Sequence, residues 1–116
     1  MSEVELIIKL IDDKKGTNIV AINVEEVTPI GKYYVIATCR NERQTRSIAD
    51  EIQDALAENN LPFHHIEGRN GDGKWMLVDA EEVIVHLFTQ EEREKYKLEK
   101  LWGDLPHLDV SKIIEE

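Results

Sequence analysis

The sequence has a single cysteine, Cys39, among its 116 residues. One cysteine cannot form an internal disulfide, so the sequence predicts a fold without that crosslink, in a reducing compartment. No apolar run comes near the roughly 20 residues that a membrane-spanning helix needs. Residues 1–5 are acidic and lack the basic region of a secretory signal or transit peptide. These absences predict a soluble, cytoplasmic protein in which Cys39 is a small buried residue at the end of a strand.

Positive charge is scarce as well, because 24 acidic residues outnumber 14 lysines and arginines and the net charge is −10. Nucleic-acid binding relies on cations that neutralise phosphates, so nucleic acid is not expected as the main contact. Opposite potentials promote association, which makes a basic protein surface the better candidate partner. The charge also has a plainer interpretation, namely that it keeps the protein soluble.

Hydrophobic residues make up 41% of the chain, which is enough for a chain of this length to bury a core. We therefore expect a single domain over residues 1–116. Isoleucine and valine recur at helical spacing from Val4 to Ile11, which predicts an amphipathic helix. Similar reasoning along the chain predicts, in order, a helix over 2–13, strands over 19–24 and 33–38, a helix over 42–58, strands over 63–66, 75–78 and 83–88, and a helix over 90–96.

This order of elements predicts an α/β fold with a mixed sheet of about five strands flanked by helices. The long helix between the second and third strands indicates a βαβ crossover, and the last two strands are close enough to form an antiparallel hairpin. Beyond residue 96, Leu98, Leu101 and Trp102 either continue the last helix or form a second turn. The tail past Pro106 has little pattern, so it either docks on the fold or stays loose.

Two groups of polar residues have part of a catalytic or metal site. His64 and His65 are neighbours in a predicted strand and point to opposite faces, so they do not share a metal ion, and no metal or cofactor is expected. Asp79 and Glu81 resemble the paired carboxylates that hold magnesium ions in nucleotidyl transfer. That reaction also needs an upstream Gly-Ser turn to hold the phosphates, and the sequence has none. A polar hairpin turn is therefore the favoured interpretation of this pair.

His86 is a sharper candidate, because strand alternation places it between Ile84 and Phe88 on one face. A histidine among apolar neighbours is usually buried and satisfied by one hydrogen bond, and Asp79 across the hairpin is the candidate partner. The other interpretation is an interface contact. Trp102 leaves a similar choice open, since it is either a plug in the core or an exposed anchor for a partner.

The stretch from Trp75 to Asp104 gathers two tryptophans, a tyrosine, a histidine on a strand and alternating charges. This composition is typical of a surface that binds another macromolecule. The stretch contains no complete catalytic set, so the sequence does not predict an enzyme.

Short motifs run along residues 12–104, namely Asp12-x-Lys14, Ile19-Val20-Ala21, Ile36-Ala37-Thr38, Arg43, Ile48-Ala49-Asp50, Glu67-Gly68, Trp75-x-x-x-Asp79, Val83-Ile84-Val85-His86 and Arg93-x-x-Tyr96-x-Leu98-Glu99-x-Leu101-Trp102. Together they resemble the ribosomal silencing factor family, also called the Iojap or oligomerisation-domain family. The family-like core covers 2–104, with a tail over 105–116. The sequence departs from the family where Cys39 to Glu42 replace a glycine and a Ser/Thr run, and where Glu81 replaces a hairpin glycine.

The resemblance implies a fold related to nucleotidyltransferases without their activity, and a homodimer in solution. It implies binding to the large ribosomal subunit through a basic interface protein, its fourteenth protein. Binding there blocks joining of the small subunit, so that translation falls when nutrients are short. Two alternatives stay open, a ribosome biogenesis factor on the same surface and a degenerate nucleotidyltransferase. By resemblance, the partner-binding residues are Trp75, Asp79, His86, Tyr96, Leu98, Glu99 and Trp102, with Arg43 nearby.

Overall fold

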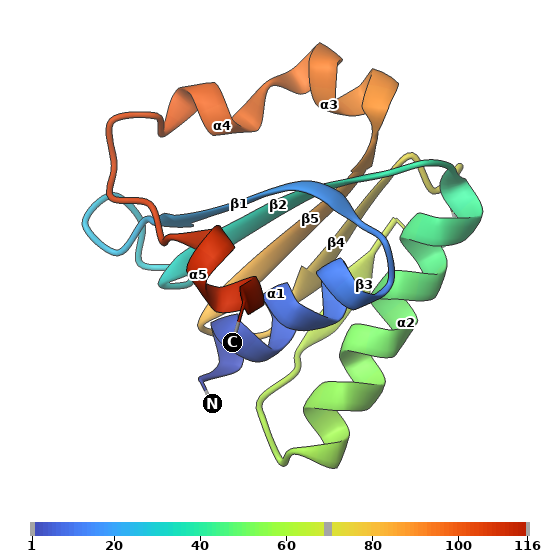
Figure 1. The fold of residues 1–116 in the computed structure, drawn as a ribbon, viewed down its shortest axis with the longest axis horizontal. Helices are drawn as coiled ribbons and strands as arrows, with labels where there is room; N and C mark the ends of the chain where they lie inside the picture. The colour runs from blue at the N-terminus through green and yellow to red at the C-terminus, as the bar shows by residue number, and fades with distance from the viewer. Residues whose placement is uncertain (1, 69–70, 116) are drawn as a thin grey trace.

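Five strands form one sheet in the order β1-β2-β5-β4-β3 (Figure 1). The computed structural model describes residues 2–68 and 71–115. Its elements are α1 (Glu3–Asp13), β1 (Thr17–Asn23), β2 (Tyr33–Cys39), α2 (Glu42–Glu58), β3 (His65–Glu67), β4 (Trp75–Asp79), β5 (Val83–Thr89), α3 (Gln90–Tyr96), α4 (Leu98–Leu101) and α5 (Val110–Glu115). Within these described residues, no helix is both long and apolar enough to cross a membrane.

The sheet is mixed, which confirms the predicted α/β fold. β2 and β5 pair in parallel, while β1 pairs with β2, and β4 with β5 and β3, in antiparallel fashion. The predicted hairpin is the pair β4–β5, in which Trp75 lies opposite Phe88 and Leu77 opposite His86. The α2 crossover does not lead to a neighbouring strand, because β3 lies at the far edge of the sheet and β5 takes the place beside β2.

α2 starts where the sequence predicts, with Asn41 as its N-cap. The Gln44 backbone N–H donates to Asn41 Oδ1 at 2.9 Å. The Gln44 side chain accepts from the Arg40 backbone N–H at 2.7 Å and donates from Nε2 to the Lys14 carbonyl at 3.0 Å. Gln44 thereby ties the end of β2, the start of α2 and the end of α1 together.

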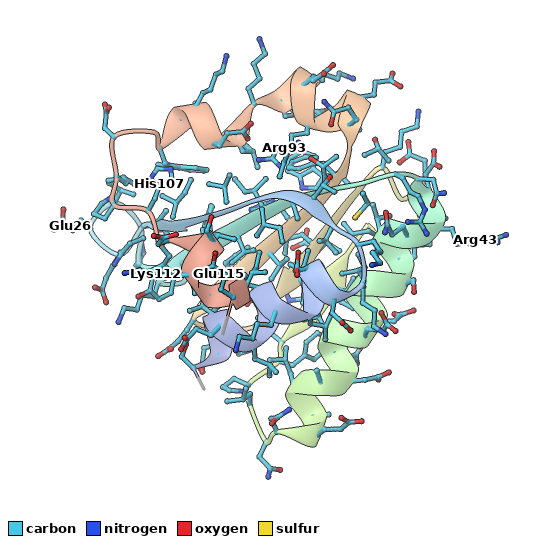
Figure 2. All side chains as sticks on the ribbon, in the orientation of Figure 1. Glu26, Arg43, Arg93, His107, Lys112 and Glu115 are labelled. Atoms are coloured by element: carbon cyan, nitrogen blue, oxygen red, sulfur yellow. The ribbon has the colours of Figure 1, made fainter. Side chains whose placement is uncertain are left out.

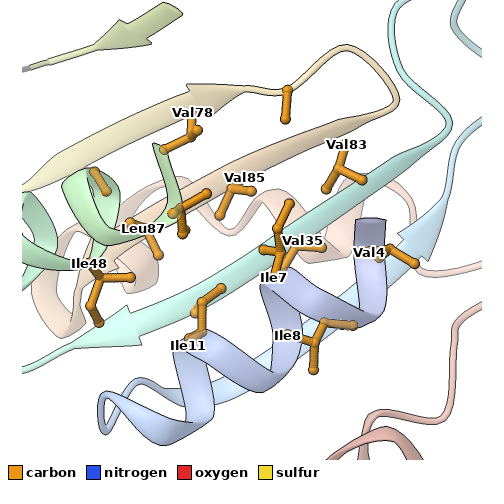
Figure 3. Close-up of a cluster of buried hydrophobic side chains, with 14 of the residues drawn as sticks. Val4, Ile7, Ile8, Ile11, Val35, Ile48, Val78, Val83, Val85 and Leu87 are labelled. Carbon is orange, nitrogen blue, oxygen red and sulfur yellow. The ribbon is translucent and has the colours of Figure 1, made fainter. Parts of the chain in front are cut away.

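One face of the sheet carries the main core, beneath α1, α2 and α5 (Figures 1 and 3). Ile7, Ile8 and Ile11 of α1 are buried with exposed fractions of 1% or less, and each such burial stabilises the fold by about 1.5–3 kcal/mol. From the sheet, β5 contributes Val85 and Leu87 to this cluster. The alternation along β5 is the predicted one, and it turns the side chains between these positions to the other face.

The second face of the sheet is covered in part by α3, α4 and the segment that follows (Figure 1). Four buried side chains form its core, and six half-buried ones pack around them. The buried ones are Ile22, Val24, Ile36 and Phe88, and the half-buried ones are Val20, Tyr34, Trp75, Leu98, Trp102 and Leu105. Because this face is only partly covered, it is where side chains are available to a partner.

The tail beyond Pro106 docks on the fold, which resolves the choice that the sequence left open. The Asn23 N–H donates to the Pro106 carbonyl at 2.8 Å, and the Leu108 N–H donates to the Ala21 carbonyl at 2.9 Å. These bonds extend the edge of β1, and α5 then packs against α1 through Ile113, which is 9% exposed. An edge strand exposes unpaired backbone groups. The segment 106–108 therefore protects part of β1 from pairing with other chains.

Cys39 is buried at the end of β2, as the sequence predicts. Burial raises the pKa of its thiol to about 11, against the opposing but smaller effect of the Arg40 charge. A thiol with so high a pKa carries little thiolate at neutral pH and is therefore a poor nucleophile.

The carboxyl group of Glu3 is buried in the first turn of α1, where Glu3 is 9% exposed. Its Oε1 has no hydrogen-bond partner among the described residues. Burial, reinforced by the charges of Glu82 and Glu81 at the β4–β5 turn, raises the pKa of Glu3 from 4.5 to about 7. The folded state therefore binds a proton at this position more tightly than the unfolded state does.

In the wild-type protein, the free energy of unfolding should fall as pH rises and the buried Glu3 carboxyl ionises. Glu3→Gln is expected to remove this fall, because glutamine does not ionise. Below pH 4.5 the group is protonated in both states, so the variant and the wild type should differ little. Between pH 4.5 and 7 only the wild type loses stability, and above pH 7 the variant should be more stable by about 1–3 kcal/mol. Urea denaturation at pH 4.5, 6 and 8 measures this difference. Glu26→Gln makes the same change on an exposed loop, and a parallel gain there would remove Glu3 as the cause.

Candidate partner-binding surface

Six rings gather on the partly covered face of the sheet, and we call them the aromatic face. They are Tyr34 of β2, Trp75 of β4, His86 and Phe88 of β5, Tyr96 of α3, and Trp102, which directly follows α4. Strand alternation puts His86 and Phe88 on one side of β5. Pairing places Trp75 opposite Phe88, and Tyr34 beside Ile84, so both rings share that side. α3 and α4 lie across this side (Figure 1) and add the other two rings.

The rings of the aromatic face are in continuous contact. Trp75 lies at the centre, with its ring centroid 4.8 Å from those of both Phe88 and Tyr96. His86 lies 5.9 Å from Trp75 and 5.3 Å from Tyr34. Tyr34 in turn meets Trp102 edge to face at 4.9 Å. Such pairs contribute about 0.5–1.5 kcal/mol each beyond their burial, so the face is a pre-organised surface.

His86 is a buried, neutral histidine within this surface, with an exposed fraction of 5%. The Trp75 indole Nε1–H donates to His86 Nδ1 at 3.1 Å, which places the ring proton on Nε2. Burial lowers the pKa of His86 to about 4, and the more distant charge of Glu67 opposes the shift. Since Nε2 has no partner among the described residues, the ring keeps one unused donor at neutral pH.

Asp79 is not the partner of His86, so this prediction is wrong. Asp79 Oδ1 accepts from the Glu81 backbone N–H at 3.0 Å, and Oδ2 lies 3.8 Å from His65 Nδ1. The carboxylate is thus engaged by the β4–β5 turn. His86 lies opposite Leu77, and Asp79 and Trp75 lie two residues to either side of Leu77 on β4. Trp75 supplies the hydrogen bond instead. The Asp79–Glu81 pair belongs to a turn, as the sequence favours.

Glu81 adopts a left-handed conformation in that turn, with φ at 69°. A glycine takes this conformation without steric cost, and the resemblance described above implies a glycine at this position. The substitution therefore leaves the turn in place and adds backbone strain and a negative charge.

Arg93 fastens α3 and α4 to the sheet (Figure 2). Its side chain is buried, and Nη1 donates to Thr38 Oγ1 at 2.9 Å and to the Asn18 carbonyl. Nε donates to Glu99 Oε1 at 3.5 Å. These partners lie on β1, β2 and α4. One guanidinium therefore holds α3, α4 and the adjoining Trp102 against the sheet, and we call this segment, residues 90–102, the arm.

The structure brings five of the predicted site residues together and separates the rest. Trp75, His86, Tyr96, Leu98 and Trp102 all lie at the aromatic face. Tyr96 is the most open of the rings, at 44% exposed. Trp75 and Trp102 are half-buried, so each packs the fold and lines the surface at once.

The other three predicted residues have different surroundings. Glu99 lies beside the aromatic face and is paired with Arg93, while Asp79 belongs to the turn. Arg43 projects from the start of α2, at the right of Figure 2, away from α4. Arg43 instead lines a depression where α1 and β2 end and α2 begins, so its role in partner binding stays a prediction.

Two further residues, Leu101 and Arg93, were not among the predicted partner-binding residues. Leu101 is 68% exposed at the end of α4 and is the most open large apolar side chain of the arm. The sequence did contain an indication of it, because Leu101 belongs to the motif that runs from Leu98 to Trp102. Arg93 belongs to one of the family-like motifs but not to the predicted site residues, and only its buried contacts show that it holds α3 and α4.

The composition of the aromatic face suits binding to a partner. His64 and His65 are exposed, and their ion-pair partners are Glu81 at 3.8 Å and Glu67 at 2.8 Å. Over the residues that the structure describes, no three His, Cys, Asp or Glu side chains converge as a metal site would need. What the face offers a partner is apolar and aromatic area with a few hydrogen-bonding groups, which is the composition of a protein-binding hot spot.

A family and several relatives that are similar to this chain carry descriptions of ribosomal silencing. The family described as "Ribosomal silencing factor during starvation" matches residues 1–116. Ribosomal silencing factor RsfS of Halalkalibacterium halodurans is 34% identical over 95% of this chain and 93% of its own. The Bacillus subtilis protein of that name is 38% identical over 85% and 83%.

A solved structure shares the fold as well. The crystal structure of a Chromobacterium violaceum protein aligns with a TM-score of 0.82 and 32% identity, over 87% of this chain and 83% of that one. The names of the relatives describe a regulatory role. The matched family, these relatives and the fold agree, and the chain belongs to the ribosomal silencing factor family.

Proposed function

We propose that this protein binds the large ribosomal subunit through its aromatic face and blocks joining of the small subunit. The contacted protein is a basic one at the subunit interface, the fourteenth of the large subunit by family resemblance. The free protein is a homodimer, and it acts in the cytoplasm to lower translation when nutrients are limiting. No catalytic step is part of this proposal.

The observation that carries the proposal is the partly covered aromatic face, with Tyr96 open to solvent and Leu101 exposed at the end of α4. Exposed aromatic and leucine side chains over a packed ring cluster are typical of an anchor for a protein partner. The chain's net charge of −10 suits a basic partner, because complementary potentials speed association and disfavour wrong partners.

Steric exclusion is sufficient for the effect. The described part of the protein measures 33 × 32 × 29 Å along its principal axes. Joined subunits approach to contact distance, so a body about 30 Å thick on the interface keeps them apart without any change in their conformation.

The direct test is co-sedimentation with purified large subunits, followed by addition of small subunits. We expect stoichiometric binding and a loss of joined particles in a sucrose gradient. Unchanged subunit association at a several-fold molar excess of the protein would reject the proposal. Analytical ultracentrifugation of the free protein measures the expected dimer.

Leu101→Asp is expected to weaken binding to the large subunit by at least about tenfold, since the loss of a hot-spot contact costs on the order of 2 kcal/mol. The fold should be unaffected, because Leu101 is 68% exposed. Ile30→Asp is the matched control, as Ile30 is 63% exposed on the β1–β2 loop. Equal losses for both variants in the co-sedimentation assay would mean that the aromatic face is not the specific contact.

A further inference from the structure

A second surface of this acidic protein brings three cations together, namely Lys14, Arg40 and Arg43. α1 ends, β2 ends and α2 begins around a depression of about 360 Å³. We call this surface the arginine end; its lining residues are Lys14, Arg40, Asn41, Arg43, Gln44, Ser47, Ile48 and Glu51. It includes Arg43, the predicted site residue that lies apart from the aromatic face.

Two of these cations have no ionic partner within residues 2–68 and 71–115. Lys14 pairs with Glu51 at 3.4 Å. Among the described residues, neither the Arg40 nor the Arg43 guanidinium has an ion pair or a hydrogen bond, and both side chains are exposed. Arg43 points outward from the start of α2 in Figure 2. By contrast, two other arginines are engaged. Arg93 is buried and donates to Thr38 Oγ1, and Arg46 donates to the Gly71 carbonyl at 2.7 Å.

Charge is separated along the sheet. Tyr33 at the start of β2 lies beside Val83 and the β4–β5 turn, whereas Cys39 at its end lies beside Thr89. The turn carries Glu81 and Glu82, with Glu3 close enough for their charges to raise its pKa. At about 3.3 Å per residue, the strand sets this acidic end roughly 20 Å from the arginine end. The acidic end therefore repels an anion, whereas the arginine end presents the Arg40 and Arg43 guanidinium groups, with Glu51 in the same depression.

We propose that the arginine end contacts the phosphate backbone of ribosomal RNA when the protein binds the large subunit. This inference rests on the proposed function and adds a second contact to it. A guanidinium presents a planar fork that binds phosphate oxygens in a bidentate manner, and Arg40 and Arg43 keep that fork free. The hydroxyl of exposed Ser47 adds a further donor in the same depression. The RNA contact supplements the aromatic face, because the overall charge of −10 makes RNA unsuitable as the main partner.

The first test compares Arg40→Gln/Arg43→Gln with Lys9→Gln/Lys112→Gln, which changes the net charge equally on α1 and α5. Affinity for purified large subunits is measured between 50 and 200 mM salt. Each phosphate contact contributes about 0.7–0.9 to the slope of log K against log salt. We expect the arginine variant to bind several-fold more weakly at low salt, with its slope reduced by about 1–2, and the lysine variant to match the wild type. An unchanged slope for the arginine variant overturns the proposal.

The second test separates RNA from an acidic protein surface. A Ser47→Cys variant carries an iron–EDTA probe, and native Cys39 stays unlabelled because it is buried with a raised pKa. Hydroxyl radicals from this position should cut ribosomal RNA, and a Lys112→Cys probe on α5 reports background cleavage. Cuts in ribosomal proteins alone overturn the proposal. If wild-type protein fails to bind large subunits at all, the proposed function fails first, which is a distinguishable result.

Discussion

Arg93→Ala is expected to lower the free energy of unfolding by about 3–5 kcal/mol, the range for breaking a buried ion pair by removing one partner. The substitution leaves Glu99, Thr38 Oγ1 and the Asn18 carbonyl without their shared donor. Glu99 has a second carboxylate oxygen, Oε2, that is already buried without a partner among the described residues. The uncompensated carboxylate is therefore the main cost of the change.

The loss should be concentrated in the arm formed by α3 and α4. Lys97 joins these helices in a left-handed conformation with φ at 49°, and both helices are too short to be stable alone. Hydrogen exchange should show early loss of protection over 90–102 and little change in α1 or α2. Glu99→Gln is the control, because it removes the charge and keeps an acceptor for Arg93, so its cost should be smaller. If Arg93→Ala unfolds no more easily than Glu99→Gln, the arginine does not hold the arm.

Trp75→Ala is expected to destabilise the fold by about 3 kcal/mol, at the lower end for the loss of a buried tryptophan, because Trp75 is half-buried. It removes the ring contacts to Phe88 and Tyr96 and the hydrogen bond to His86 Nδ1. Binding to large subunits should fall as well, since this ring lies at the centre of the aromatic face.

Trp75→Phe separates the two contributions of that side chain. It keeps an aromatic ring and removes the indole donor, which leaves His86 Nδ1 buried without a partner, as Nε2 already is, at a cost of about 1–3 kcal/mol. Urea denaturation measures both variants, and circular dichroism checks that the fold is retained. A phenylalanine variant as stable as the wild type would show that the hydrogen bond contributes nothing to stability.

Periodic apolar positions predict the elements well in this chain. The spacing from Val4 to Ile11 places α1 within a residue of its true start, and Asn41 marks the start of α2. The alternation along β5 puts His86 and Phe88 on one face and Val85 and Leu87 on the other. These features follow from short-range geometry, since the side of an element that is apolar is the side that is buried.

The candidate site depends on contacts between distant parts of the chain, and here local pattern is a weaker guide. Arg93 and Thr38 are 55 positions apart, so nothing in the helix around Arg93 indicates that its side chain is buried. Arg43 and Trp75 both belong to the family motifs, yet they lie on different surfaces because α2 starts on the other side of the sheet.

Amino-acid pattern alone was enough for the fold class, the faces of the strands and the family. Choosing between Asp79 and Trp75 as the partner of His86 required the packed structure, because both residues lie diagonally from it along β4. The same holds for the docked tail, whose six-residue helix α5 has no stable pattern of its own and is held by α1 and the edge of β1. Hydrophobic periodicity records which residues leave water, whereas the identity of their neighbours is set only when the elements pack.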